Sequence, residues 1–151
     1  MMDDRITPHF TLGEFIVSST AARLGIDNAP PARVEATLRN VLIPAMQRVR
    51  DLLGVPVVIK SGYRSPELNS AVRGAPSSQH VTGHAADFIA PGFGSPRAVC
   101  LVLVDRMAEL HFDQLILEGG WVHISFGPRP RNEVLTAHFT AAGVSYTRGL
   151  G

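Results

Sequence analysis

Apolar residues recur along the chain at two spacings, one typical of helices and the other typical of strands. Between Val34 and Leu52 they recur every three or four positions, which indicates an amphipathic helix with one buried face. This helix is predicted to begin after Pro30-Pro31 and to end at Gly54. Pro44 is expected to kink it, because proline has no amide hydrogen for the helical hydrogen bond.

Capping signals predict three further helices. Thr11 and Glu14 have the spacing of a capping box, so a helix is expected over residues 12–24. A serine followed by proline opens a brief helix at residues 65–66 and a longer one over residues 95–110. Most of the predicted helix therefore lies in the first two thirds of the chain.

Short segments rich in β-branched and aromatic residues predict the strands. They cover residues 55–60, 85–90, 112–118 and 121–126, and Gly119-Gly120 joins the last two as a hairpin. Helices come early and strands come late. This order predicts an α+β domain whose small, mainly antiparallel sheet is covered by helices on one face.

Alternation along the strands exposes two polar side chains on the open face of the sheet. His123 falls on the face opposite Val122 and Ile124, and Asp87 falls on the face opposite Phe88. Each of them has an ordinary interpretation, a hydrogen-bonded histidine or a turn-capping aspartate. A metal ion would also pair them, and two neutral imidazoles with one carboxylate suit Zn²⁺ and leave a fourth position for water.

Length, composition and charge limit the class of protein. The chain has 151 residues, of which 45% are hydrophobic, enough for one domain over residues 1–151 with a buried core. Charged residues make up 18% and leave a net charge of +1, without the basic stripe that binds nucleic acid. We expect a monomer with no nucleic-acid partner.

Other features bear on the compartment. The single cysteine, Cys100, lies in an apolar stretch, so a core position is expected and no internal disulfide can form. No stretch has the length of a membrane span. The chain begins with MMDDRITPHF, which is acidic where a secretory signal would be basic. Synthesis as a soluble cytoplasmic protein is predicted, so a substrate outside the cytoplasm must be reached by another route.

Three ordered motifs resemble one family. Residues 78–87, SQHVTGHAAD, match the S-x-H-x-x-G-x-A-x-D motif of the zinc D-Ala-D-Ala carboxypeptidase family, which includes phage cell-wall endopeptidases. Residues 121–123, WVH, resemble its W-x-H strand, and residues 61–65, SGYRS, resemble a third block. The likeness covers roughly residues 6–126 and is similar to the short single-domain branch found in phages and prophages.

The resemblance implies a hedgehog/D-Ala-D-Ala peptidase-like fold with zinc on the open face of the sheet. It implies that His80, Asp87 and His123 are the zinc ligands. His84 falls on a variable position of the motif and is expected to be exposed or to line the cleft.

The resemblance also implies catalytic roles. Glu118 is predicted as the general base and then acid, although some relatives carry this carboxylate three residues before the last ligand, where this chain has Gly120. Asp113 is the second candidate for the base, and a solvated hairpin carboxylate is the alternative for Glu118. Arg64 resembles the cleft arginine that binds the substrate carbonyl, and a surface arginine is its alternative.

Three more residues are candidates for substrate binding. Ser78 corresponds to the first serine of the motif and is predicted to donate to a substrate carboxylate or to cap the loop. Tyr63 and Trp121 are expected either to line the groove or to pack in the core.

The resemblance predicts a zinc metallopeptidase that cuts the peptides of bacterial peptidoglycan at a bond involving a D-amino acid, as a carboxypeptidase or as an endolysin-type endopeptidase. A phage or prophage product, released by a separate permeabilising protein or carried in a tail, fits this prediction. Two alternatives stay open: a catalytically inactive, zinc-stabilised cell-wall binding module, and a metal amidohydrolase acting on another small amide.

Overall fold

A six-stranded sheet dominates the computed structural model, which describes residues 4–150. Its strand order is β3–β4–β6–β5–β7–β8, and all neighbours are antiparallel except the parallel pair β5 and β7. The strands are Val58–Ser61 (β3), Ala85–Ile89 (β4), Gln114–Leu117 (β5), Val122–Ser125 (β6), Glu133–Thr140 (β7) and Gly143–Arg148 (β8). The predicted mainly antiparallel sheet is confirmed. The predicted domain limits at residues 1 and 151 lie outside the described residues, and the single domain stays a prediction.

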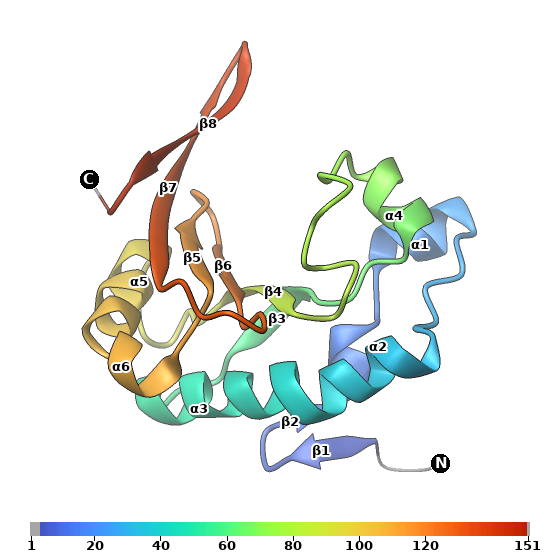
Figure 1. Ribbon diagram of the computed structural model, residues 1–151, viewed down its shortest axis with the longest axis horizontal. Coiled ribbons are helices and arrows are strands. Elements are labelled where there is room, and N and C mark those ends of the chain that lie inside the picture. The colour runs from blue at the N-terminus through green and yellow to red at the C-terminus, as the bar shows by residue number, and fades with distance from the viewer. Residues whose placement is uncertain (1–3, 151) are drawn as a thin grey trace.

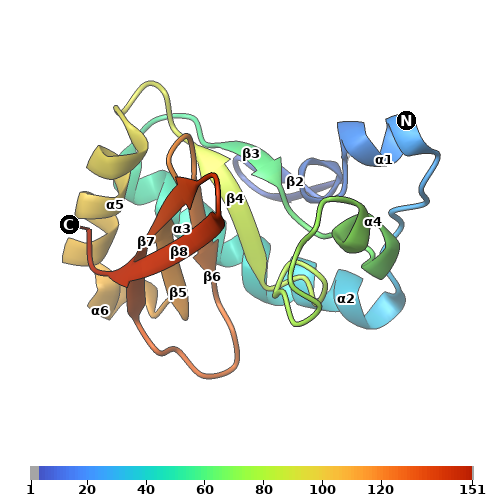
Figure 2. The same ribbon diagram turned by 90° about the horizontal axis from the view of Figure 1, so that it is seen from above.

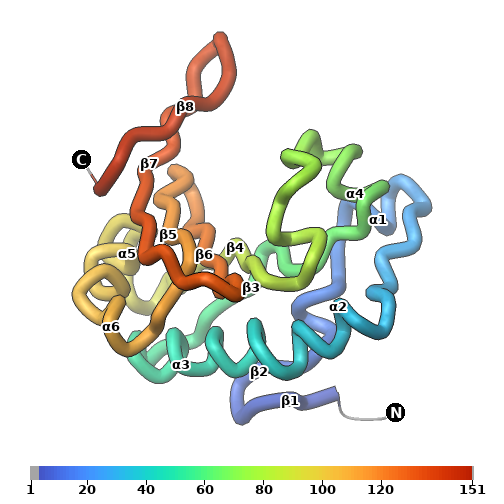
Figure 3. Tube along the Cα trace, in the orientation of Figure 1, coloured from blue at the N-terminus to red at the C-terminus, as the bar shows by residue number. Residues whose placement is uncertain are grey.

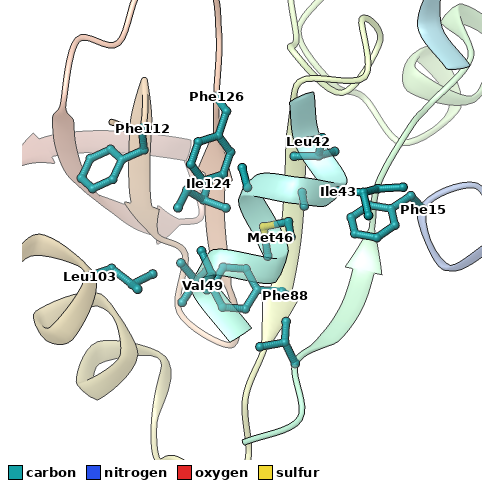
Figure 4. Packing of buried hydrophobic residues seen from close by; sticks show 14 of the residues in the cluster. Phe15, Leu42, Ile43, Met46, Val49, Phe88, Leu103, Phe112, Ile124 and Phe126 are labelled. Carbon is teal, nitrogen blue, oxygen red and sulfur yellow. The ribbon is translucent and has the colours of Figure 1, made fainter. Parts of the chain in front are cut away.

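Helices pack on one face of this sheet (Figures 1 and 2). They are α3 (Ile43–Leu53), α5 (Pro96–Asp105) and α6 (Met107–Leu110). Figure 4 shows Met46 and Val49 of α3 and Leu103 of α5 beside Phe88 and Ile124 of the sheet, all of them buried. The α+β class is therefore confirmed, with the apolar face of β4 and β6 turned toward the helices.

The long predicted helix is present, with an irregular turn in front of Pro44. It consists of α2 (Ala32–Thr37), the π-helical turn η2 (Leu38–Leu42) and α3. The Ile43 amide donates to the Leu38 carbonyl, five residues back, which widens the helix where Pro44 has no amide hydrogen to donate. The helix ends at Gly54, whose φ of 69° is left-handed, as predicted.

The prediction of one helix over residues 12–24 is wrong. The structure has β1 (Arg5–Thr7), β2 (Phe10–Thr11), the 3₁₀ turn η1 (Gly13–Phe15) and, after a break, α1 (Ser19–Leu24). A continuous helix would need the carbonyls of Phe15 and Ile16. The Tyr63 amide takes the first at 2.7 Å, and the Asn28 side-chain amide takes the second at 2.7 Å. Distant partners therefore stop the helix, and Ser18 caps a new one.

The last predicted helix is also interrupted. The sequence predicts one helix over residues 95–110, but α5 and α6 are separated at Arg106, whose φ of −113° leaves the helical region. The break turns the final residues so that Leu110 is buried in the core. The short helix α4 (Pro66–Ala71) is present, and its cap Ser65 accepts from the Leu68 amide at 3.1 Å, as the serine–proline signal predicts.

The chain continues beyond the predicted elements into the hairpin of β7 and β8. Figures 1 and 3 show this hairpin projecting from the body of the molecule on the opposite side from α4 and the loop that follows α4. The β7–β8 hairpin projects on one side of β4 and β6, and α4 with its following loop projects on the other side. None of the described helices is long and apolar enough to cross a membrane.

Candidate metal centre

Strand pairing brings two of the predicted ligands together. In the antiparallel pair of β4 and β6, Asp87 lies directly opposite His123, so their side chains share one face of the sheet. His123 Nδ1 lies 2.9 Å from Asp87 Oδ1, and His80 Nε2, from the loop before β4, lies 3.2 Å from the same oxygen. One donor atom from each of the three residues falls within 4.8 Å of the others.

Backbone contacts fix the ring of His80. The ring is 2% exposed, and its Nδ1 lies 2.7 Å from the Gly62 carbonyl. A carbonyl can only accept, so Nδ1 carries the proton, and Nε2 is left to face Asp87. Gly62 is needed here, because a Cβ at this position would lie 2.5 Å from the Phe15 carbonyl oxygen.

The charge states of these residues suit a metal ion. Burial lowers the pKa of His80, which keeps the imidazole neutral at neutral pH. Burial alone would raise the pKa of Asp87, but the hydrogen bond from His123 and the close ring of His80 outweigh it and hold the pKa well below its usual range. An unprotonated Nε2 and a carboxylate oxygen would thus face each other with lone pairs 3.2 Å apart. A cation held between them removes this repulsion, and two imidazoles with one carboxylate are a donor set that zinc prefers.

Arg64 lies beside this group and is held from three sides. Its Nη2 lies 3.5 Å from Asp87 Oδ2, its Nε donates to Ser61 Oγ at 3.2 Å, and its Nη1 donates to Asn69 Oδ1 at 3.0 Å. Gly74 leaves room for this arrangement, because a Cβ there would lie 2.1 Å from Asn69 Oδ1. The Arg64 side chain is thus 15% exposed and its guanidinium is held at the edge of the site, unlike that of a surface arginine without partners.

The two candidate bases have different surroundings. Glu118 follows β5 and lines the same cavity as the metal group. Burial, followed by the negative charge of Asp87, raises the pKa of Glu118. Asp113 is paired with Arg131 through contacts of 2.5 and 3.0 Å, and this hydrogen bonding lowers its pKa. Asp113 is absent from the cavity lining, whereas Glu118 is part of it.

The other sequence candidates divide between the cavity and the core. Ser78 and Trp121 line the cavity, and Ser78 Oγ also accepts from the His80 amide at 3.2 Å. Tyr63 is 4% exposed and packs in the hydrophobic core, so the structure does not bring it to the site. His84 Nδ1 is hydrogen-bonded with Thr82 Oγ1 at 2.8 Å, and His84 lies outside the metal group.

We call the cavity of about 710 Å³ above the metal group the cleft. Its lining includes Arg64, Arg73 and Gln79 from the segment between β3 and β4, and Glu118, Phe139 and Tyr146 from the end of β5 and the β7–β8 hairpin. Sequence reasoning missed Gln79 and the two hairpin aromatics. Alternating β-branched and aromatic residues around Gly143 were the signal that a hairpin followed residue 126.

Comparison with known proteins agrees with this site. A sequence model described as peptidase M15 matches residues 8–125, which include all three metal-group residues. A zinc D-Ala-D-Ala carboxypeptidase of Streptomyces albus G is 36% identical over 89 residues, which cover 58% of this chain and 34% of that protein. The matched segment thus spans about one third of the length of this relative. The family model covers most of the chain, and the chain belongs to the peptidase M15 family.

Proposed function

We propose that this protein is a zinc metallopeptidase that hydrolyses peptide bonds of bacterial peptidoglycan, at a bond that involves a D-amino acid. The observation that carries the proposal is the orientation of His80. Its proton is committed to the Gly62 carbonyl, so its Nε2 lone pair converges with His123 and Asp87 on one point of the cleft. Membership of the peptidase M15 family and the name of the Streptomyces relative support the substrate class.

The ligands would be His80, Asp87 and His123, which leave one coordination position open. Bound zinc supplies a Lewis acid for the scissile carbonyl and lowers the pKa of water. The chain supplies the proton transfer. A raised pKa makes Glu118 a stronger base than an ordinary glutamate, so it takes a proton from water as the water oxygen bonds to the carbonyl carbon. It then returns that proton to the amine nitrogen as the C–N bond breaks.

Arg64 and Ser78 position the substrate in this proposal. The Arg64 guanidinium is permanently charged and held by Ser61 and Asn69, so it stabilises the negative charge that develops on the carbonyl oxygen. Ser78 lines the cleft and donates its hydroxyl hydrogen to a substrate carboxylate while its oxygen accepts from the His80 amide. Trp121 contributes an apolar surface to the cleft that Glu118 also lines.

The test is the release of new free amino groups from purified cell-wall sacculi. Wild-type protein is expected to release them, and Glu118→Gln is expected to lower the rate by at least about a hundredfold while zinc stays bound. Glu109→Gln, an exposed carboxylate paired with Arg106, is the matched control and should keep full activity. An inactive binding module predicts zinc and wall binding without any release. Turnover of a small non-peptide amide alone would favour an amidohydrolase.

Muropeptide mass spectrometry after digestion identifies the bond. Fragments that lack only a terminal residue indicate a carboxypeptidase, and separated cross-links indicate an endopeptidase. We also propose that the protein acts as a monomer on the wall, in a phage or prophage setting. Its mass in solution by light scattering tests the monomer.

A further inference from the structure

We propose that the β7–β8 hairpin is an apolar wall of the cleft, and that Phe139 and Tyr146 bind the peptide chain of the substrate. This inference rests on the proposed peptidase function and deepens it. The hairpin follows residues 8–125, the part of the chain that the family model matches, so the wall is an addition to the part that carries the metal group.

The hairpin has one apolar and one polar face. Strand pairing places Ala137 opposite Tyr146 and Phe139 opposite Val144, and alternation puts these four residues on the same face. The other face carries His138, whose Nε2 lies 2.8 Å from Thr147 Oγ1. The apolar face thus carries Phe139, Tyr146 and Val144 beside the buried Ala137, and Leu135 opposite Arg148 lies on the same face at the base of the hairpin.

This apolar face is turned toward the cleft. Phe139 and Tyr146 line the same cavity as Asp87 and His123. The Phe139 ring lies over the β5–β6 turn, where its Cε2 is 3.7 Å from the position of a Cβ on Gly119. Burial, followed by the negative charges of Glu118 and Asp87, raises the pKa of Tyr146, so its hydroxyl stays protonated near the site.

The aromatic residues nevertheless remain open to solvent. Phe139 is 59% exposed, Tyr146 is 51% exposed and Val144 is 47% exposed. Figure 1 shows the hairpin projecting beyond the other strands, away from the helices. A cluster of exposed apolar side chains on one face of an isolated arm is typical of a binding surface, because it leaves apolar area in water until a ligand covers it.

The chemistry of the two walls selects a peptide as the occupant. The wall opposite the hairpin carries the guanidinium groups of Arg64 and Arg73, which suit carboxylates. The hairpin wall offers Phe139 and Tyr146, which suit aliphatic side chains. A peptide that carries both carboxylates and aliphatic side chains meets both walls, whereas a glycan strand is rich in hydroxyl groups and offers few charges to the arginines.

The experiment compares variants on the two faces of the hairpin, with a sugar-free stem peptide as the probe. Phe139→Ala and Tyr146→Ala should each raise KM by about tenfold, the effect of losing about 1.4 kcal/mol of binding, with kcat changed less than about threefold. His138→Ala and Ser145→Ala, on the opposite face, should leave both constants unchanged. Phe139→Leu should retain most of the affinity because it keeps an apolar contact. Zinc content and thermal unfolding are measured for every variant.

A second readout separates this inference from the proposed function. If wild-type protein cleaves no peptide, the proposed function fails, and binding of the same peptide is followed by the fluorescence of Trp121, the single tryptophan, which lines the cleft. Weaker binding by Phe139→Ala and Tyr146→Ala would still support the wall. Equal binding by all variants, or no binding by wild-type protein, would overturn it.

Two other outcomes would also overturn the inference. If the two substitutions weaken binding only of disaccharide-bearing muropeptides, and not of the sugar-free peptide, the wall binds glycan. If wild-type protein is a dimer that these substitutions convert to a monomer, a second copy of the chain covers the hairpin.

Discussion

A single hydrogen bond distinguishes the two histidines of the loop before β4. His80 is buried and directs one ring nitrogen to the Gly62 carbonyl and the other to Asp87. His84, four residues later, contacts Thr82 and remains outside the metal group. The Gly62 carbonyl holds the proton on Nδ1 of His80, so Nε2 is free to bind a metal. Being a histidine of this loop is therefore not enough to make a residue a ligand.

Replacing each histidine by alanine tests this distinction. His80→Ala removes a donor atom and should weaken zinc binding by more than about a hundredfold, because a missing ligand costs at least as much as a missing partner of a ligand. His84→Ala should leave one zinc per chain. Metal analysis after dialysis of both purified variants measures this, and the reverse pattern would show that the assignment of the two residues is wrong.

Gly62 should be as important as a ligand although it carries no side chain. A Cβ in Gly62→Ala would lie 2.5 Å from the Phe15 carbonyl oxygen, so the strand must shift, and the carbonyl that orients His80 shifts with it. We expect a lower melting temperature and zinc affinity reduced about ten- to a hundredfold. Gly120→Ala is the control, since no atom lies within 4 Å of its Cβ. Unchanged zinc affinity in Gly62→Ala would argue against backbone orientation of His80.

At the scale of the element, sequence patterns predicted the helices and helix ends that depend on neighbouring residues. The α2–α3 helix and its end at Gly54 followed from apolar spacing and from the conformation that glycine allows. The prediction of the first helix was wrong because the Phe15 and Ile16 carbonyls accept hydrogen bonds from residues 48 and 12 positions away. The spacing of apolar residues cannot reveal such distant partners.

The site divides in the same way. The motif contained His80 and Asp87, and strand alternation put His123 on their face of the sheet. The sequence could not identify the α4 residue Asn69 as the partner of Arg64, or predict the burial of Tyr63. Both depend on contacts between elements. The β7–β8 hairpin went unpredicted although its pattern is local.

Asn28 should be a principal link between the first elements and the segment that joins β3 to α4. Its side chain donates to the carbonyls of Ile16 and Tyr63 at 2.7 and 3.1 Å, and accepts from the Ser65 amide at 2.8 Å. Asn28→Ala leaves these three backbone groups without their partner and should lower the free energy of unfolding by about 2–4 kcal/mol. Asn40→Ala, at an exposed helix position, should change it by less than about 0.5 kcal/mol. Urea unfolding measures both, and equal effects would contradict this role.

For the whole molecule, the metal group should make the metal-free protein sensitive to acid. Burial lowers the pKa of His80 in the native state, so below its ordinary value of 6.5 the unfolded chain binds a proton that the native state does not. Unfolding is then favoured, and the free energy of unfolding should fall as pH decreases from 7.5 to 5.5, by at most about 1.4 kcal/mol per pH unit for this group. The lowered pKa of Asp87 acts in the same direction below pH 3.8.

The raised pKa of Glu118 has the opposite sign, because the native state then binds its proton more tightly than the unfolded chain. The contribution of His80 is therefore measured as the difference in slope between metal-free wild-type protein and His80→Gln. The variant should have the shallower slope in urea unfolding between pH 7.5 and 5.5. Identical slopes would mean that His80 is not buried in its neutral form.

Removing zinc should destabilise the molecule without unfolding it. The metal group lies on the open face of the sheet, whereas the core lies on the other face, where Phe88, Leu115 and Ile124 are fully buried. Binding to the native state alone adds about 4 kcal/mol at a thousandfold excess of free metal over Kd, and removal of the metal loses that increment. Small zinc-dependent folds have no comparable core and unfold without metal. After chelation, circular dichroism should therefore keep its helical and strand signals and show a lower melting temperature. A random-coil spectrum would mean that zinc, and not the core, holds the chain together.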